Sequence, residues 1–469
     1  MKYKGISYFI MASMVSFSCV TKPAQENSST QKFTGASGEV KLITLDPGHF
    51  HAALVQKSAY DQVSNDVYVY APKGQELAAH LNLIKGFNTR NTTPTEWNEH
   101  IYTGPDFLQK MITEKKGNVM VTAGNNRKKT EYIKETLEAG INVLADKPMV
   151  INTENFEMLK ECFRIAQEKG LFLYDIMTER YEITSMLQGF LSQQKAIYGE
   201  QLKGTPDSPA VIEESVHHFF KLVDNKPLVR PAWFFDVEQE GEGIVDVTTH
   251  LVDLIQYETF PGVALDYTKD YEVLDAHRWY TPILKKQFCE VTGLNDYPSY
   301  LTKYLSGDTL NVYSNGDMTY KLKGVTAKVS VTWKYAFPKG GGDTHFAIMK
   351  GSKASLIIRQ GKEENFKPEL YIQATNEVEQ TAYTKAIKNV EAQVAAKYPG
   401  VVFTKEKEGL WHVEIPATYR DGHEAHFGKV TQHFLRYLKE GALPAWEVPN
   451  MIAKYYVTTR ALEIAKQKK

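Results

Sequence analysis

Cysteine is scarce in this chain, and neither sign of charge is in excess. Only three cysteines occur among 469 residues, at positions 19, 162 and 289. That number excludes a disulfide framework, and no two of the three have metal-ligand spacing. The 55 basic and 56 acidic side chains leave a net charge of −1, so nothing favours nucleic acid as a partner. The length predicts at least two globular domains.

Long apolar runs are also missing, except at the N-terminus. Lys2 and Lys4 precede an apolar run over residues 6–17, which is too short for a membrane span and predicts a secretory signal over residues 1–18. Cys19 directly follows Ser18, a junction that resembles a bacterial lipoprotein signal and implies that Cys19 is lipidated. The polar residues 19–38 would then be a tether. We expect a location in the bacterial cell envelope, on the periplasmic side, with membrane contact only through the lipid. An ordinary cleaved signal is the alternative.

Short apolar runs alternate with helical stretches over residues 39–178. Strand-like runs occur at residues 40–45, 66–70, 118–122, 141–144 and 171–176, with amphipathic stretches at 106–116, 129–139 and 153–169. Residues 75–103 are longer and more polar, and we expect a helix and a loop there. This alternation predicts an α/β fold with a doubly wound parallel sheet.

Two short motifs carry the chemistry. ADKPMV, residues 145–150, places Lys147 at the carboxyl end of a strand, where α/β folds bind their ligands. GEGIVDVTTHLVDLIQY, residues 241–257, predicts a helix from residue 244 with Asp246, His250 and Asp253 on one face. A carboxylate one turn before an imidazole can fix its tautomer, as a general acid–base pair requires. Taken alone, a solvated lysine before a turn and an incidental histidine near a helix start would be the more usual interpretations of the two motifs.

Together, EAGINVLADKPMV and GEGIVDVTTHLVDLI resemble the two motifs of the Gfo/Idh/MocA oxidoreductase family, in the same order and over roughly residues 40–260. The resemblance implies an N-terminal Rossmann-like domain that binds NAD, with NADP also open. It implies hydride exchange with a carbohydrate secondary alcohol or ketone, and our specific expectation is C3 of a glycoside or hexose. Lys147 would polarise the carbonyl or alkoxide, His250 would exchange the hydroxyl proton, and Asp246 would orient His250. We expect the cofactor to be held tightly and recycled in place.

The expected cofactor site departs from the usual glycine motif. The three positions of G-x-G-x-x-G fall on Asp46, Gly48 and His51, and only Gly48 is a glycine. His49 and His51 are candidate phosphate or substrate contacts, with polar residues at a helix start as the equal alternative. The acidic residue expected near residues 71–72 for the ribose is absent. The other candidate cofactor contacts come from the turn after the second strand, from the counterpart of the family's nicotinamide loop and from the strand-end lysine: Lys73, Ala123, Gly124, Asn125, Asn126 and Lys147.

The pattern changes to successive strands in the second domain, residues 179–448. Strand-like runs at residues 209–223, 271–278, 309–314, 318–323, 326–335, 344–350 and 354–359 predict an α+β domain with a large, mainly antiparallel open sheet. NGD at residues 315–317 is typical of a hairpin turn. Residues 379–397 and 421–439 are expected to be helical, and a last helix over 449–469 is expected to pack on the first domain. We expect a homo-oligomer.

Candidate substrate contacts follow the sixth strand and continue into the second domain. One of His217 and His218 should face the cleft and the other should be a surface residue, because neighbours on a strand alternate. Trp233 is a candidate for stacking on a sugar ring, with a core position as the alternative. Glu179 is a further candidate beside the main set, which is Arg180, Tyr181, His217, His218, Trp233, Asp246 and His250.

Two other classes of function stay open. A metal-dependent lyase or hydrolase would bring His217 or His218 together with His250, His423 and His426. His423 and His426 lie three apart, but no third ligand follows at standard spacing, and the leading interpretation has no metal. A non-catalytic sugar-binding lipoprotein would fit the altered glycine motif.

Overall fold

The computed structural model describes residues 32–223 and 226–468. The predicted signal peptide, Cys19 and most of the predicted tether lie outside the described residues. In the part of the chain that is described, no helix is both long and apolar enough to cross a membrane.

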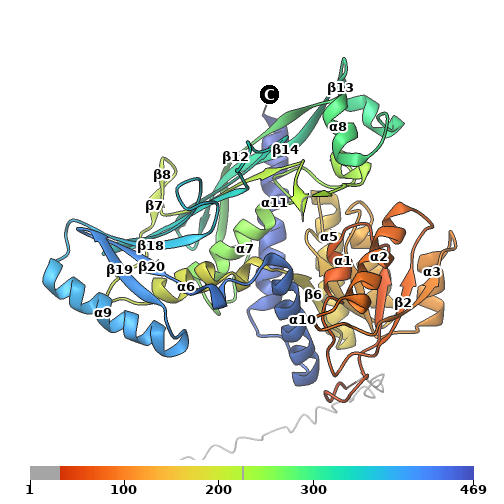
Figure 1. The fold of residues 1–469 in the computed structure, drawn as a ribbon, viewed down its shortest axis with the longest axis horizontal. Coiled ribbons are helices and arrows are strands. Elements are labelled where there is room, and N and C mark those ends of the chain that lie inside the picture. Colours follow the sequence, from red (N-terminus) through yellow and green to blue (C-terminus); the bar gives the residue numbers. More distant parts are fainter. Residues whose placement is uncertain (1–31, 224–225, 469) are drawn as a thin grey trace, which may run out of the picture. The chain divides into compact units, whose positions relative to one another are not determined.

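The first domain contains a six-stranded parallel sheet in the order β3-β2-β1-β4-β5-β6 (Figure 1). The strand order reverses between β1 and β4, the point at which such sheets bind ligands at their carboxyl edge. The predicted Rossmann-like, doubly wound sheet is therefore confirmed. Its strands are β1 (Leu42–Leu45), β2 (Asp66–Tyr70), β3 (Asn98–Tyr102), β4 (Val119–Thr122), β5 (Asn142–Asp146) and β6 (Leu173–Ile176). Its helices are α1 (His51–Leu54), α2 (Gln75–Thr89), α3 (Phe107–Glu114), α4 (Lys129–Glu138) and α5 (Thr153–Lys169).

Burial explains which of these elements the sequence reveals. Every residue of β1, β4, β5 and β6 is buried, as expected for parallel strands covered on both faces. The region 75–103 corrects the expectation of a helix and a loop, because β3 follows α2 and pairs in parallel with β2. β3 is polar and mostly exposed at the sheet edge, so it lacks the apolar run that marks a buried strand.

The second sheet is large and mainly antiparallel, as predicted. Its ten strands run in the order β12-β14-β15-β9-β16-β17-β18-β20-β19, with β13 beside β14, and β9 pairs in parallel with β15. The strands are β9 (Val211–His218), β12 (Tyr271–Leu284), β13 (Leu305–Ser306), β14 (Thr309–Leu322), β15 (Val325–Lys334), β16 (Thr344–Lys350), β17 (Ala354–Gln360), β18 (Glu369–Ala374), β19 (Val402–Lys407) and β20 (Leu410–Glu414). Two short ribbons pair β7 (Gly204–Thr205) with β8 (Ser208–Pro209) and β10 (Leu222–Val223) with β11 (Lys226–Pro227).

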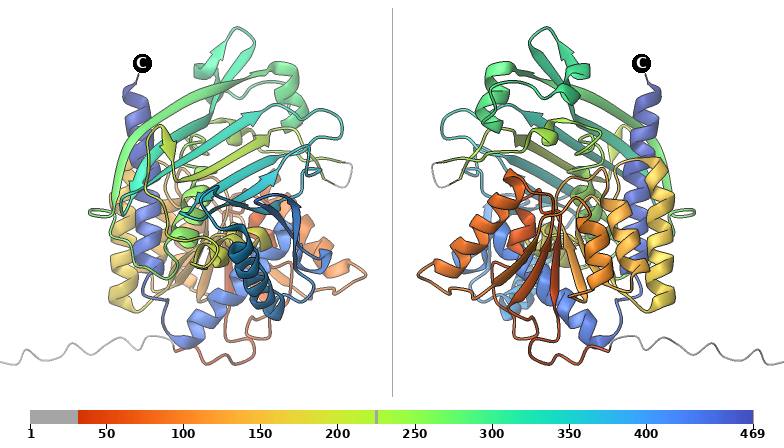
Figure 2. Two further views of the ribbon diagram at one scale, coloured as in Figure 1. Left: turned by 90° about the vertical axis from the view of Figure 1, so that its left-hand side faces the viewer. Right: turned by 90° about the vertical axis from the view of Figure 1, so that its right-hand side faces the viewer.

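Helices join this sheet to the first domain. Figure 2 shows the broad sheet, in green to blue, above the parallel sheet, in red to orange. α6 (Ile183–Ser192) and α7 (Thr248–Thr259) share one buried apolar cluster with the broad sheet. α11 (Glu447–Gln467) contacts β12 and α7 of the second domain and α5 of the first. The remaining elements are α8 (Lys285–Thr292), α9 (Gln380–Lys397), α10 (His423–Glu440), η1 (Glu179–Tyr181), η2 (Ala232–Phe235), η3 (Ser299–Tyr304) and η4 (Ala417–Tyr419).

The chain returns to the first domain earlier than residue 449. Phe427 and Phe434 of α10 belong to the same buried cluster as the parallel sheet, together with Tyr455 of α11. α10, which the sequence placed in the second domain, therefore packs on the first.

The predicted hairpin turn at residues 315–317 is wrong, because β14 runs through it. The side-chain amide of Asn315 donates to two oxygens of β12, so the residue that suggested a turn cross-links strands. A Cβ on Gly316 would lie 2.9 Å from Cβ of Ile244, and glycine here allows that close approach. The turn lies instead at Lys323 and Gly324, whose φ angles of 49° and 81° suit a type I′ hairpin.

Candidate active site

Lys147 and Asp246 meet where the two domains join. Lys147 follows β5, and its ammonium lies 2.5 Å from Oδ1 of Asp246, with side chains 12% and 8% exposed. Burial lowers the pKa of Lys147, but the charges of Asp246 and Asp146 outweigh burial and leave that pKa above its ordinary value. Lys147 is therefore a fixed positive charge at the carboxyl edge of the parallel sheet.

Asp246 precedes α7 rather than lying inside it. α7 begins at Thr248, four residues later than the sequence predicts, and turns occupy residues 243–247. A Cβ on Gly243 would lie 1.8 Å from the carbonyl oxygen of Ser314, so this segment runs against β14 before the helix can start. The expected orientation of His250 by Asp246 is not formed, since Asp246 accepts from Lys147 instead.

His250 lies in the first turn of α7 and is held neutral beside Lys147. Burial, and then the positive charge of Lys147, lower the pKa of His250 to about 4. Its Nδ1 atom is buried and has no hydrogen-bond partner among the described residues. A neutral imidazole can accept a proton at pH 7, as a base for alcohol oxidation must.

Arg180 corrects the prediction of a substrate contact. Its guanidinium donates to both carboxylate oxygens of Asp253, at 2.6 and 2.7 Å, and to Glu447 at 3.0 and 3.1 Å. Lys454 completes the network with ion pairs of 2.8 Å to Asp253 and 2.7 Å to Asp175. Arg180 is 5% exposed, so it stabilises the junction of η1, α7 and α11 and does not reach a ligand.

Tyr181 also points away from Lys147. Its phenol lies 2.5 Å from Nδ1 of His433 on α10, and burial raises the pKa of Tyr181 beyond its ordinary value. Its ring joins the partly buried residues packed on the core of the first domain. Tyr181 therefore helps to attach α10 and is not placed as a substrate contact.

The loop after β1 is closed against the loop after β4. The N–H groups of Gly48 and His49 both donate to the carbonyl of Ala123, at 3.1 Å each. A Cβ on Gly124 would lie 2.6 Å from the carbonyl oxygen of Asp46, so residue 124 must be glycine. Asp46 itself has a φ of 48°, the left-handed conformation that glycine usually supplies.

Asn125 and Asn126 use their side chains to join the domains. The amide of Asn125 donates to Oε1 of Gln239 at 2.7 Å, and the amide of Asn126 donates to the carbonyl of Glu240 at 2.7 Å. These amides are therefore engaged by protein rather than presented to a cofactor. Lys73 is exposed in the turn before α2.

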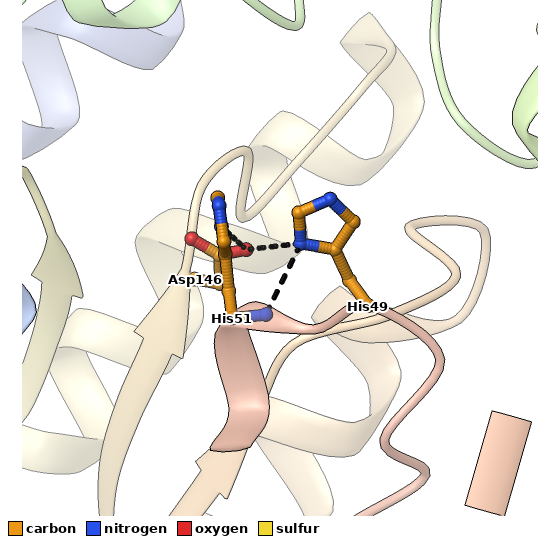
Figure 3. A group of neighbouring side chains, drawn as sticks. All are labelled: His49, His51 and Asp146. Carbon is orange, nitrogen blue, oxygen red and sulfur yellow. Dashed lines mark hydrogen bonds and ion pairs between the residues drawn. The ribbon is translucent and has the colours of Figure 1, made fainter. Parts of the chain in front are cut away.

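His49 and His51 converge on Asp146, the last residue of β5 (Figure 3). Nδ1 of His51 lies 3.0 Å from Oδ2 of Asp146, and Nδ1 of His49 lies 3.9 Å from the same oxygen. Burial lowers the pKa of both imidazoles well below the ordinary value. The loop residues that the sequence selected are thus part of a three-residue cluster.

Both histidines at the end of β9 contact Asp343. Nδ1 of His218 lies 2.9 Å from its carboxylate, and Nδ1 of His217 lies 3.4 Å from it. The expectation that one of them is an ordinary surface residue is wrong, since His218 is buried and His217 is partly buried. Asp343, just before the neighbouring strand β16, reaches both rings.

A cavity of about 330 Å³ opens beside His49, with walls from both domains. Trp233 lines it, and the ring of Trp233 would lie 3.1 Å from a Cβ on Gly48. Trp233 also belongs to a buried aromatic cluster with Phe219 and Trp333. It therefore fulfils both interpretations, as part of a core and as a wall of a pocket.

Three residues near the site were not found from the sequence. Asp146 and Asp343 are described above, and His345 lies 3.3 Å from the buried Glu213 through Nε2. Asp146 could have been found, because it ends a buried strand beside Lys147. Asp343 follows a glycine run and His345 is the second residue of β16, and neither position has a motif.

Glu179 and His423, two further candidates from the sequence, form a pair with each other. Nδ1 of His423 lies 3.3 Å from Oε1 of Glu179. Burial raises the pKa of Glu179, but the hydrogen bond and charge of His423 outweigh burial and lower it.

The histidine set of the metal-dependent alternative does not converge. Among the described residues, His49, His51 and Asp146 form the one group with metal-ligand geometry.

Lys147 and His250 fit the nicotinamide end of a cofactor, although the glycine loop is altered and its N–H groups at Gly48 and His49 are bonded to Ala123. The buried, unpartnered Nδ1 of His250 beside the charge of Lys147 indicates that a bound group completes the site. Asp46 accepts a hydrogen bond from Tyr132 at 3.1 Å, and burial raises its pKa. Lys147 and His250 would lie at the nicotinamide end.

Comparisons with known proteins give matches over both domains. Residues 50–175 match the family described as "Oxidoreductase family, NAD-binding Rossmann fold". Residues 187–466 match the family described as "Putative oxidoreductase C terminal domain". No curated protein matches the chain.

Several solved structures are similar to this one. A "putative oxidoreductase" from Parabacteroides merdae is 65% identical, covers 94% of this chain and 100% of its own, and has a TM-score of 0.93. Levoglucosan dehydrogenase in complex with NADH is 13% identical over 91% of this chain and 97% of its own, with a TM-score of 0.57. A variant of a 3-ketoreductase from Actinomadura kijaniata, with TDP-benzene and NADP, is 12% identical over 90% and 96%, with a TM-score of 0.53. The last two show a shared fold.

Proposed function

Since this chain belongs to the Gfo/Idh/MocA oxidoreductase family, we propose that it exchanges a hydride between a nicotinamide cofactor and a carbohydrate secondary alcohol or ketone. One observation carries the proposal. The ion pair of Lys147 with Asp246, 2.5 Å long, and the neutral His250 beside it lie at the carboxyl edge of an NAD-binding fold, where such sheets bind ligands.

Each residue has a task that its surroundings support. The ammonium of Lys147 binds the substrate oxygen and stabilises the negative charge that develops there as the hydroxyl loses its proton. His250 accepts that proton, because its low pKa keeps it neutral. Asp246 positions Lys147 and keeps it charged. The cofactor, when bound, supplies the hydride acceptor.

Proteins of the same fold support a carbohydrate as substrate. The cavity beside His49 has aromatic walls from Trp233 and Tyr300, but Lys147, Asp246 and His250 are not among its lining residues. The names levoglucosan dehydrogenase and 3-ketoreductase, carried by two proteins of the same fold, agree with this class. Oxidation at C3 of a glycoside or hexose is the specific form that we propose.

A pair of matched substrates tests this reaction. The full chain, supplied with NAD or NADP, is incubated with a methyl hexoside and with its 3-deoxy analogue. Formation of reduced nicotinamide with the hexoside and none with the analogue supports oxidation at C3. Equal rates with both would place the reaction at another carbon, and no reduction across hexosides would refute the carbohydrate proposal.

We further propose that the chain is exported and anchored through lipidated Cys19, and that it retains NAD through turnover. Support for export comes from the N-terminal sequence, in which Cys19 follows an apolar run and Ser18. In the source organism or a bacterial host, Cys19→Ser should move the protein from the membrane fraction to a released fraction. Fatty-acid labelling that persists in Cys19→Ser would refute the anchor.

A further inference from the structure

Three ligand atoms converge at the end of β5. One ligand atom from each of His49, His51 and Asp146 lies within 4.8 Å of the other two, and Nδ1 of each histidine lies within 3.9 Å of Oδ2 of Asp146. Ligands about 2.1 Å from a tetrahedral zinc ion are about 3.4 Å apart, and the separations of 3.0 and 3.9 Å from Asp146 bracket that value. The atoms are therefore already close to the spacing of a coordination shell.

The cluster is built on rigid elements. Asp146 ends a fully buried strand, and the two histidines sit on the short connection from β1 into α1. The side chains are 19% exposed for His49, 10% for His51 and 6% for Asp146. In Figure 3 both imidazoles are directed at the same carboxylate oxygen.

A simple hydrogen bond explains only one of the two rings. His51 can donate to Asp146 from Nδ1 at 3.0 Å. Nδ1 of His49 faces the backbone N–H of His51 at a long 3.4 Å and makes no shorter contact among the described residues. Its ring stands edge-on to His51 with centroids 4.0 Å apart, so a lone pair is aimed into the cluster without a strong partner.

The two lysines nearest the cluster each have an acceptor other than the carboxylate of Asp146. Lys147, which follows Asp146, is neutralised by Asp246 at 2.5 Å. Buried Lys129 donates to the backbone carbonyl of Asp146 at 3.0 Å, not to its carboxylate.

We propose that His49, His51 and Asp146 bind one divalent transition-metal cation of the Zn²⁺ class. Two imidazoles and one carboxylate suit Zn²⁺ and related ions, whereas Mg²⁺ and Ca²⁺ prefer oxygen ligands alone. Three protein ligands leave a coordination position open. Because His49 also lines the cavity, an oxygen of a ligand in that cavity can fill this position. Metal binding at this site requires no nicotinamide cofactor, so it can be tested independently of the hydride transfer.

Titration with Zn²⁺ alone tests the site in the full, chelator-treated chain. One Zn²⁺ per chain should bind with a Kd below about 1 µM, and Mg²⁺ at the same concentration should not compete. His49→Ala, His51→Ala and Asp146→Asn should each raise the Kd at least about tenfold, since even the loss of an outer partner of a metal ligand costs that much. Circular dichroism and melting curves identify the variants that remain folded. Because His49 is the most exposed of the three residues, His49→Ala should disturb the fold least.

His100→Ala is the matched control. It removes a histidine that lies 2.8 Å from Asp66 on the exposed edge of the same sheet, a pair without a third ligand. Its Zn²⁺ affinity should equal that of the wild type. Absence of saturable binding, or binding that folded His49→Ala and His51→Ala leave unchanged, would show adventitious zinc only and overturn the proposal.

Discussion

Lys147 and Asp246 are 99 residues apart in the chain, yet their side chains form an ion pair 2.5 Å long. One residue directly follows a strand of the parallel sheet, and the other precedes the helix that supports the antiparallel sheet. The pair therefore fixes the two domains at the point where the reaction is proposed. An isosteric substitution of one partner removes the charge of the ion pair and keeps most of its packing, so the role of the charge can be tested.

Asp246→Asn should lower turnover by about 10²–10⁴-fold, the usual contribution of a group that controls proton transfer. The amide keeps the shape but loses the charge that holds the pKa of Lys147 above its ordinary value. Burial then dominates, so the pKa of Lys147 falls and the alkaline limb of the rate profile moves to lower pH. Steady-state rates measured across pH check both effects. An unchanged pH profile would show that Asp246 does not control the pKa of Lys147.

Arg180→Met should destabilise the protein by about 3–5 kcal/mol, the cost of leaving buried charges without their partner. Asp253 and Glu447 would both lose the guanidinium. Urea unfolding measures the loss, with Arg164→Met as the control, because Arg164 pairs with Glu161 and Glu168 in an exposed position. The control should unfold like the wild type. Equal stability of Arg180→Met and the control would contradict the structural role of Arg180.

Gly243→Ala should destabilise the protein by about 3 kcal/mol or more. The new Cβ would lie 1.8 Å from the backbone oxygen of Ser314, which cannot move without displacing β14. Gly86→Ala on α2 is the matched control, because nothing lies within 4 Å of a Cβ there. Alanine in that helix should stabilise by about 0.5–1 kcal/mol. The melting temperature should fall in Gly243→Ala and rise in Gly86→Ala, each relative to the wild type.

His80→Leu should stabilise the protein more at pH 5 than at pH 7.5. Burial lowers the pKa of His80 to about 4, and neither ring nitrogen has a partner among the described residues. The unfolded chain therefore takes up a proton near pH 6.5 that the folded chain does not take up until about pH 4. The stability that depends on a neutral ring is complete above pH 6.5 and is lost as pH falls. A difference from the wild type that stays constant across pH would contradict this reasoning.

The sequence revealed the residues whose positions follow from local order. Lys147 and His250 were predicted because each lies in a local motif and the two motifs together, in this order, resemble those of one family. Arg180 was misassigned because its partner Glu447 is 267 residues away in the chain, and no local pattern shows such a contact. The turn predicted at Asn315 was wrong for a related reason. The local sequence NGD suggests a turn, whereas the amide of Asn315 donates a hydrogen bond to β12. Local propensity predicted the fold, and long-range pairing decided what each polar side chain does.

The central claim is that Lys147 binds the substrate oxygen and His250 accepts its proton beside a bound nicotinamide. The most direct measurement is the absorbance of reduced nicotinamide when a hexoside is added to the purified chain, followed by mass spectrometry of the nucleotide released on denaturation. The wild type should form reduced nicotinamide without added cofactor and release one dinucleotide per chain. Lys147→Met should release the same dinucleotide and form none of the reduced species. A chain that releases no nucleotide, and that neither binds nor reduces added NAD or NADP, would contradict the account.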